Sequence, residues 1–113
     1  MAYTKQLLSG STNGRGIKVV ATATLGTTIH TAHATAKDEV YLYAYNSDTA
    51  DVDLTIELGG VTAPDDNIVI TLPVKAGRLC IVDGQPLTGG VVVTAFASSA
   101  NKVVITGYVN RIT

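Results

Sequence analysis

The sequence predicts a single all-β domain, an antiparallel β-sandwich or barrel-like fold with an extended N-terminal arm. Three observations support this prediction. Val, Ile and Thr, whose branched side chains suit a pleated sheet, make up 38 of 113 residues. Apolar and polar residues alternate with the two-residue period of a strand in several short segments. Turn signals that contain Gly or Asn separate these segments at intervals of roughly 8 to 12 residues, as in sandwiches and barrels.

The clearest strand spans residues 52–58. Its apolar residues occupy every second position, and Asp53, Thr55 and Glu57 lie between them. This alternation is typical of a strand with one buried side and one side that faces solvent. The other segments with strand character are 3–8, 17–24, 27–31, 40–45, 68–72, 78–82, 91–97 and 103–109.

The segment 40–45 places three phenol rings on one predicted strand. Tyr41, Tyr43 and Tyr45 alternate with apolar residues, so the three rings are expected to line one face of a sheet. A tyrosine joins a large apolar ring to a polar tip and is common where proteins meet. The row can therefore be a binding face, or it can pack beneath an arm or against a neighbouring subunit.

Turns are expected where Gly or Asn can adopt positive φ. The dipeptides with this signal are Asn13-Gly14, Gly59-Gly60, Ala76-Gly77, Asp83-Gly84, Gly89-Gly90 and Ala100-Asn101, and polar runs at 46–48 and 64–67 add two more. Residues 32–38 carry no apolar stripe and are expected to form a loop. No segment has the periodicity of an amphipathic helix.

Residues 1–16 are polar and contain Gly10, Gly14 and Gly16, which predicts a flexible N-terminal arm, with the folded body over residues 17–113. All nine acidic residues lie between positions 38 and 83, so the arm is basic. Such separation of charge is compatible with docking of the arm on an acidic neighbour, or with contacts between copies. The candidate partner-binding residues are Lys5, Leu7, Leu8, Arg15, Lys18, Tyr41, Tyr43 and Tyr45.

Composition narrows the function classes. A net charge of −1, one Phe and no Trp disfavour binding of nucleic acid or of sugars, which need basic or aromatic surfaces. The longest apolar stretch has six residues, at 40–45, so no membrane association is expected. The N-terminus lacks the apolar run of a signal peptide, which predicts synthesis in the cytoplasm.

The residues able to perform chemistry form no recognisable catalytic motif. His30 and His33 are three apart, on opposite sides of a strand, so they are expected to be polar loop or surface residues and not a metal pair. Cys80 lies in an apolar run and is expected to be a small buried hydrophobe. The carboxylates of Asp48, Asp51, Asp53, Asp65 and Asp66 could hold a hard cation or could cap Asx turns. We expect no enzymatic activity and no cofactor.

From about residue 40 onward the order of strand and turn residues is familiar. The segments that define it are Ile56-Glu-Leu-Gly-Gly60, Pro64-Asp-Asp, Leu72-Pro-Val-Lys-Ala-Gly77, Asp83-Gly84-Gln-Pro86, Ala95-Phe-Ala97, Ala100-Asn101 and Gly107-Tyr-Val-Asn-Arg-Ile112. Together they resemble small virion proteins of tailed bacteriophages that decorate or cement the capsid. The resemblance covers roughly two-thirds of the chain.

The resemblance implies a β-sandwich-like structural protein on the capsid exterior. Its partner would be the major capsid protein, and it would assemble as a homo-oligomer, with a trimer favoured because such proteins often sit on threefold axes. Two alternatives stay open: a tail or connector component, which would assemble into rings, and a non-catalytic ligand-binding β module. The second alternative requires exposed tyrosine rings as a platform for the ligand.

Overall fold

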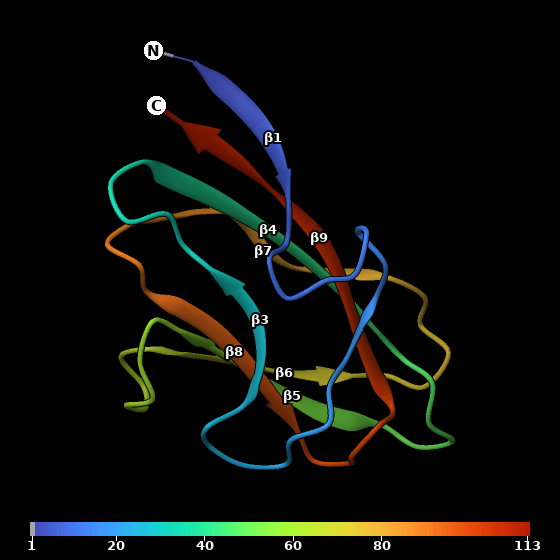
Figure 1. The fold of residues 1–113 in the computed structure, drawn as a ribbon. Coiled ribbons are helices and arrows are strands. Elements are labelled where there is room, and N and C mark those ends of the chain that lie inside the picture. The colour runs from blue at the N-terminus through green and yellow to red at the C-terminus, as the bar shows by residue number, and fades with distance from the viewer. Residues whose placement is uncertain (1) are drawn as a thin grey trace.

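The computed structural model describes residues 2–113 and contains nine strands and no helix within them. All pairings are antiparallel, and the strands form two sheets that pack together, which confirms the all-β prediction (Figure 1). The first sheet, sheet A, has the order β1-β9-β4-β7 and comprises β1 (Tyr3–Leu7), β9 (Val103–Ile112), β4 (Lys37–Asn46) and β7 (Leu79–Leu87), with β2 (Ile17–Lys18) also paired to β9. The second, sheet B, has the order β3-β8-β5-β6 and comprises β3 (Thr27–Thr31), β8 (Val92–Ala97), β5 (Val52–Leu58) and β6 (Asn67–Leu72).

Two long central strands organise sheet A. Strands β4 and β9 have ten residues each and pair along their whole length, from Lys37 opposite Ile112 to Asn46 opposite Val103. Both β1 and β2 lie along the other edge of β9, with β1 opposite residues 108–112 and β2 opposite residues 104–105. The two ends of the described chain, Ala2 and Thr113, consequently lie side by side and exchange two backbone hydrogen bonds (Figure 1).

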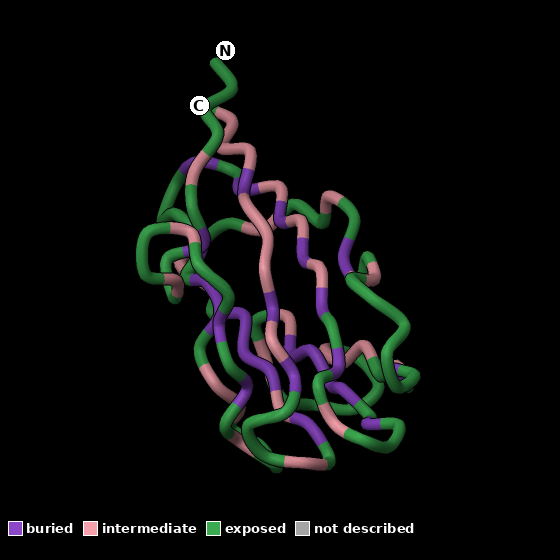
Figure 2. The backbone as a smooth tube through the Cα atoms, turned by 90° about the vertical axis from the view of Figure 1, so that its right-hand side faces the viewer, coloured by how far each residue is buried: buried purple, intermediate pink, exposed green. Residues whose placement is uncertain are grey.

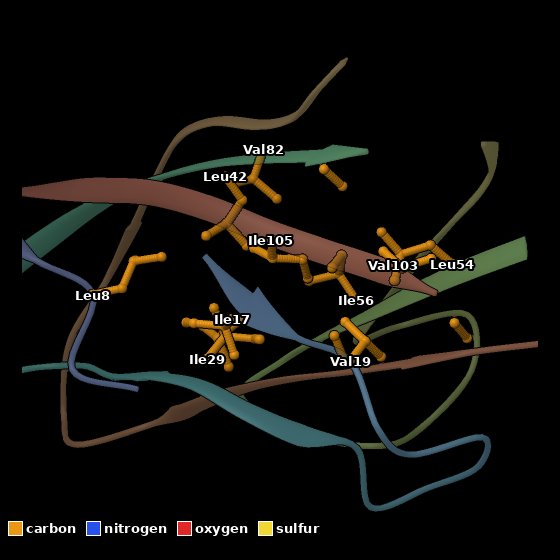
Figure 3. Close-up of a cluster of buried hydrophobic side chains, with 14 of the residues drawn as sticks. Leu8, Ile17, Val19, Ile29, Leu42, Leu54, Ile56, Val82, Val103 and Ile105 are labelled. Atoms are coloured by element: carbon orange, nitrogen blue, oxygen red, sulfur yellow. The ribbon is translucent and has the colours of Figure 1, made fainter. Parts of the chain in front are cut away.

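The core consists of aliphatic side chains from the facing sides of the two sheets. Buried residues alternate with more exposed ones along β4, and β9 buries Val103, Ile105 and Val109 (Figure 2). Leu42 and Ile105 from sheet A and Leu54 and Ile56 from sheet B are fully buried and point into the same interior (Figure 3). Burying one such side chain stabilises the fold by about 1.5 to 3 kcal/mol, so this layer is the main stabilising element.

The extended N-terminal arm is not confirmed. Residues 3–7 form β1, which pairs with β9 from Tyr3 opposite Ile112 to Leu7 opposite Tyr108, and Leu8 is only 2% exposed within the core. The chain then meets β3, where the amide of Gly10 donates to the carbonyl of Ile29 at 2.9 Å. An edge strand pairs along one side and needs little apolar character, which explains why a polar sequence forms it. Met1, the first residue of the predicted arm, lies outside the described residues.

Three further expectations need correction. The strand predicted over residues 17–24 ends at Lys18. The amide of Val19 still donates to Val103 in β9, but the carbonyl of Ala21 accepts from Ala97 in β8, so the chain crosses here from sheet A to sheet B. The pair Asp83-Gly84 is not a turn but lies inside β7, where the register with β4 shifts and Gly84 takes a φ of 84°. The solvent-facing side predicted for β5 is also wrong at Thr55 and Glu57, which are 7% and 0% exposed.

Candidate functional site

The outer face of sheet A carries every tyrosine of the chain. Side chains of directly opposed residues share a face, so the register fixes which residues point away from the core. The tyrosines on this outer face are Tyr3, Tyr41, Tyr43, Tyr45 and Tyr108, from β1, β4 and β9. The predicted row on β4 is thus confirmed as a shared face. We call the outward-facing residues of β1, β2, β9, β4 and β7, with Arg15 and Arg78 beside them, the tyrosine face.

Two cations and a glycine cover the ring faces of three tyrosines. The rings of Tyr41 and Tyr108 stack with centroids 4.8 Å apart and 13° between their planes. The ammonium of Lys5 lies 4.7 Å from the centroid of Tyr108, and Gly84 lies so close to Tyr41 that a Cβ there would be 3.1 Å from its hydroxyl oxygen.

At the other side of the face, the Arg78 guanidinium carbon lies 4.7 Å from the ring centroid of Tyr43. Burial raises the pKa of the Tyr43 phenol, so Tyr43 is a neutral hydrogen-bonding group at physiological pH. Lys5, Arg78 and the stack of Tyr41 on Tyr108 thus cover ring faces of three tyrosines, whereas the ring of Tyr45 is exposed.

Exposed apolar groups and a shallow hollow complete the tyrosine face. Tyr3 is 66% exposed and Leu7 59% exposed on β1, while Tyr45 is 37% exposed at the far end of β4. Beside Tyr45 lies a hollow with a volume of about 400 Å³, which Arg15 and Val104 help to line. Of the predicted partner-binding residues, only Leu8 is absent from this face, because its side chain is buried in the core.

The tyrosine face is basic although the chain as a whole carries a charge of −1. Its cations are Lys5, Arg15, Lys18, Lys37 and Arg78, and its acids are Glu39 and Asp83. The remaining positions hold three cations and seven acids, so the charge separation seen along the sequence becomes a separation in space. Within residues 2–113, the one ion pair between a carboxylate and a Lys or Arg side chain joins Asp38 to Arg111, which leaves the cations of the tyrosine face without an ionic partner.

A buried polar cluster inside the sandwich joins three strands. It consists of His30 from β3, Asp38 from β4 and Arg111 from β9. The Asp38 carboxylate accepts hydrogen bonds from Arg111 Nε at 2.8 Å and from a terminal guanidinium nitrogen at 3.1 Å. It also lies 2.8 Å from His30 Nε2. Burial alone would raise the pKa of Asp38, but the hydrogen bonds from Arg111 and His30 outweigh it and lower that pKa to about 2.

His30 also fixes the N-terminal segment. Its Nδ1 accepts a hydrogen bond from the amide of Ser9 at 3.0 Å, so Nε2 carries the proton and donates to Asp38. The Ser9 hydroxyl in turn accepts from the amide of Thr31 at 2.7 Å. The expectation of a loop or surface histidine is therefore wrong for His30, which is 1% exposed, whereas His33 is exposed between β3 and β4.

Glu57 anchors the chain that crosses between the sheets. Its carboxylate accepts hydrogen bonds from the Thr94 hydroxyl at 2.6 Å, the Thr24 hydroxyl at 2.8 Å and the Gly26 amide at 2.9 Å. Burial opposes ionisation of Glu57, but these three donors outweigh it and hold its pKa below the ordinary value. Both buried carboxylates thus have structural partners, and neither faces a solvent-filled site.

The other residues singled out in the sequence do not converge on a metal site. Within residues 2–113 no three His, Cys, Asp or Glu side chains are placed to hold a metal ion. Asp48, Asp51 and Asp66 instead accept hydrogen bonds from backbone amides of Thr49, Val74 and Thr62. Cys80 is exposed on the tyrosine face, opposite Tyr43, and is not the buried residue that its apolar neighbours predicted.

Sequence reasoning missed Tyr108 and Arg78 on the tyrosine face and Asp38 and Arg111 in the buried cluster. Tyr108 alternates with buried residues of β9, so a period-two signal for its direction was present. Arg111 is 73 positions from Asp38, and no local pattern joins two residues so far apart.

The sequence matches no protein-family model, and neither curated proteins nor solved structures match it. Among the described residues, no helix has the length and apolar character needed to cross a membrane.

Proposed function

We propose that this protein is a structural virion protein of a tailed bacteriophage that decorates and stabilises the capsid by binding the major capsid protein. One observation favours a protein partner above all. All five tyrosines gather on one sheet face, together with Arg78 over the ring of Tyr43, and Tyr and Arg are enriched where proteins meet. The resemblance of residues 40–112 to small phage virion proteins supplies the identity of that partner.

The proposal includes a homotrimer on the outside of the shell. A trimer would repeat the tyrosine face around a threefold axis, so several weak contacts with the shell could act together. Sedimentation of the purified chain tests the oligomer directly. A trimer supports this part of the proposal, and a monomer at micromolar concentration contradicts assembly in solution.

Binding to shells tests the proposed function itself. Purified protein is mixed with assembled shells of the major capsid protein, and the bound fraction is measured after pelleting. We expect saturable binding to shells and none to purified tails. Binding confined to tails, or rings of the protein alone, would instead assign it to the tail or connector.

A further inference from the structure

We propose that the tyrosine face docks on an acidic protein surface, with Lys5 and Arg78 as the cations that meet its carboxylates. The inference rests on the proposed function and names the chemistry of the partner and the residues that recognise it. It concerns sheet A alone and assigns no role to the outer face of sheet B.

The charge balance of the tyrosine face is the first argument. Five cations and two acids lie on it, and the acids, Glu39 and Asp83, form no ion pair with these cations. Opposite charges across an interface speed association and exclude wrong partners. An acidic surface is therefore the complement of this face.

The fixed positions of Lys5 and Arg78 are the second argument. Each cation lies over a tyrosine ring, Lys5 near the β1 edge of sheet A and Arg78 near the β7 edge. A long side chain held in place by a ring loses less conformational entropy when it binds a carboxylate. The rings of Tyr41, Tyr43 and Tyr108 lie between the two cations and supply the apolar part of the contact.

A second copy of this chain is a poorer occupant. The carboxylates near β5 and β6 are already engaged in hydrogen bonds within the chain. Asp53 accepts one from the Thr71 hydroxyl at 2.8 Å, and Asp51 accepts one from the Val74 amide at 3.0 Å. Sheets A and B also turn their outer faces in opposite directions. Packing one on the other would create an open-ended stack instead of a closed oligomer.

A peptide probe tests the inference without the phage. The probe is a labelled 16-residue peptide in which Glu alternates with Ser and Leu, and its control carries Lys in place of Glu. Binding is followed by fluorescence anisotropy and by amide chemical shifts of the isotopically labelled full chain. We expect binding of the acidic peptide only, weakened by salt, with shifts on β1, β4, β7 and β9. No binding, or shifts centred on β5 and β6, would overturn the inference.

Two matched double variants identify the cations. Lys5→Glu with Arg78→Glu should weaken peptide binding at least tenfold, while Lys75→Glu with Lys102→Glu, which makes the same change in net charge at two residues that are not part of the tyrosine face, should change it less than twofold. Thermal unfolding of each variant checks the fold, and Lys5→Gln with Arg78→Gln provides a neutral version. Equal loss in both pairs would reduce the effect to net charge and overturn the assignment.

Shell binding separates the two proposals. If the wild-type protein does not bind shells but binds the acidic peptide through the tyrosine face, the proposed function is wrong and the assignment of the face to an acidic protein surface stands. If Lys5→Glu with Arg78→Glu still decorates shells at full occupancy, the docking chemistry fails and the proposed function stands. Self-association that this variant loses, and that Asp51→Lys with Asp53→Lys restores when the two proteins are mixed, would assign the face to a second copy.

Discussion

Replacing Arg111 with Met should destabilise the fold strongly because it leaves the buried Asp38 carboxylate without its guanidinium. Arg111→Met keeps most of the apolar part of the side chain and removes two hydrogen bonds, at 2.8 and 3.1 Å. Lowering the pKa of Asp38 from 3.8 to about 2 corresponds to roughly 2 kcal/mol in favour of the ionised form. Removing one partner of a buried pair typically costs about 3 to 5 kcal/mol.

We expect the free energy of unfolding to fall by about 3 kcal/mol, at the lower end of this range. The Arg111 side chain is 24% exposed, so water can replace part of its hydrogen bonding to Asp38 in the variant. For a domain of this size the loss corresponds to a decrease in Tm of roughly 10 to 20 °C. Urea unfolding at pH 7 measures it. Arg78→Met is the matched control, since Arg78 is itself exposed and contacts the half-buried ring of Tyr43, and it should cost less than about 1 kcal/mol.

The pH dependence of this loss checks its cause. Asp38 has a lowered pKa in the folded state, so the stability it contributes is present above pH 4 and is lost as the pH falls toward 2. In Arg111→Met the Asp38 carboxyl group takes up a proton at higher pH than in the wild type. The difference in free energy of unfolding between the variant and the wild type should therefore shrink as the pH falls from 4 toward 2. A cost below about 1 kcal/mol at pH 7, or a gap that is the same at pH 7 and pH 2.5, would refute the reasoning.

Three further predictions follow from the same contacts. The wild type should lose stability as the pH falls from 4 to 2, because Asp38 and Glu57 both have lowered pKa values, and Asp38→Asn should flatten that dependence in urea titrations at a series of pH values. Leu8→Ala should cost about 2 to 5 kcal/mol in the same assay, whereas Leu7→Ala, next to it but exposed, should cost less than about 0.5 kcal/mol; similar values would contradict the burial of Leu8. Gly107→Ala should prevent folding because its Cβ would overlap the carbonyl oxygen of Tyr41, while Gly77→Ala, with open space around it, should remain folded by circular dichroism.

The sequence predicted the sheets better than it predicted their surfaces. Strand β5 begins and ends where its alternation begins and ends, and the row of Tyr41, Tyr43 and Tyr45 faces one side as expected. Glu57 shows the limit of this reasoning. The side of β5 that carries Glu57 was predicted to face solvent. Thr24 and Gly26, which lie more than 30 positions earlier in the sequence, instead donate hydrogen bonds to Glu57 and cover it. Alternation shows that two sides of a strand differ, and tertiary contacts decide which side meets water.

The candidate site was predictable only in part for a related reason. The basic residues near the N-terminus and the tyrosines of β4 were recognised, but the sequence did not reveal that they share one face. That arrangement depends on β9, which places Tyr108 between β1 and β4. The N-terminal residues were expected to reach a partner as a free arm. They instead supply Lys5 and Leu7 to the same face as part of the folded sheet.

Hydroxyl-radical footprinting of the protein bound to shells tests the central proposal most directly. All five tyrosines lie on the tyrosine face, so their oxidation reports on this face and no other, while Phe96 and Val69 report on sheet B. Shell binding should protect Tyr3, Tyr45 and the half-buried tyrosines between them and leave Phe96 and Val69 unchanged. Unchanged tyrosine oxidation on shells that carry the protein, with protection of Val69, would contradict the proposal.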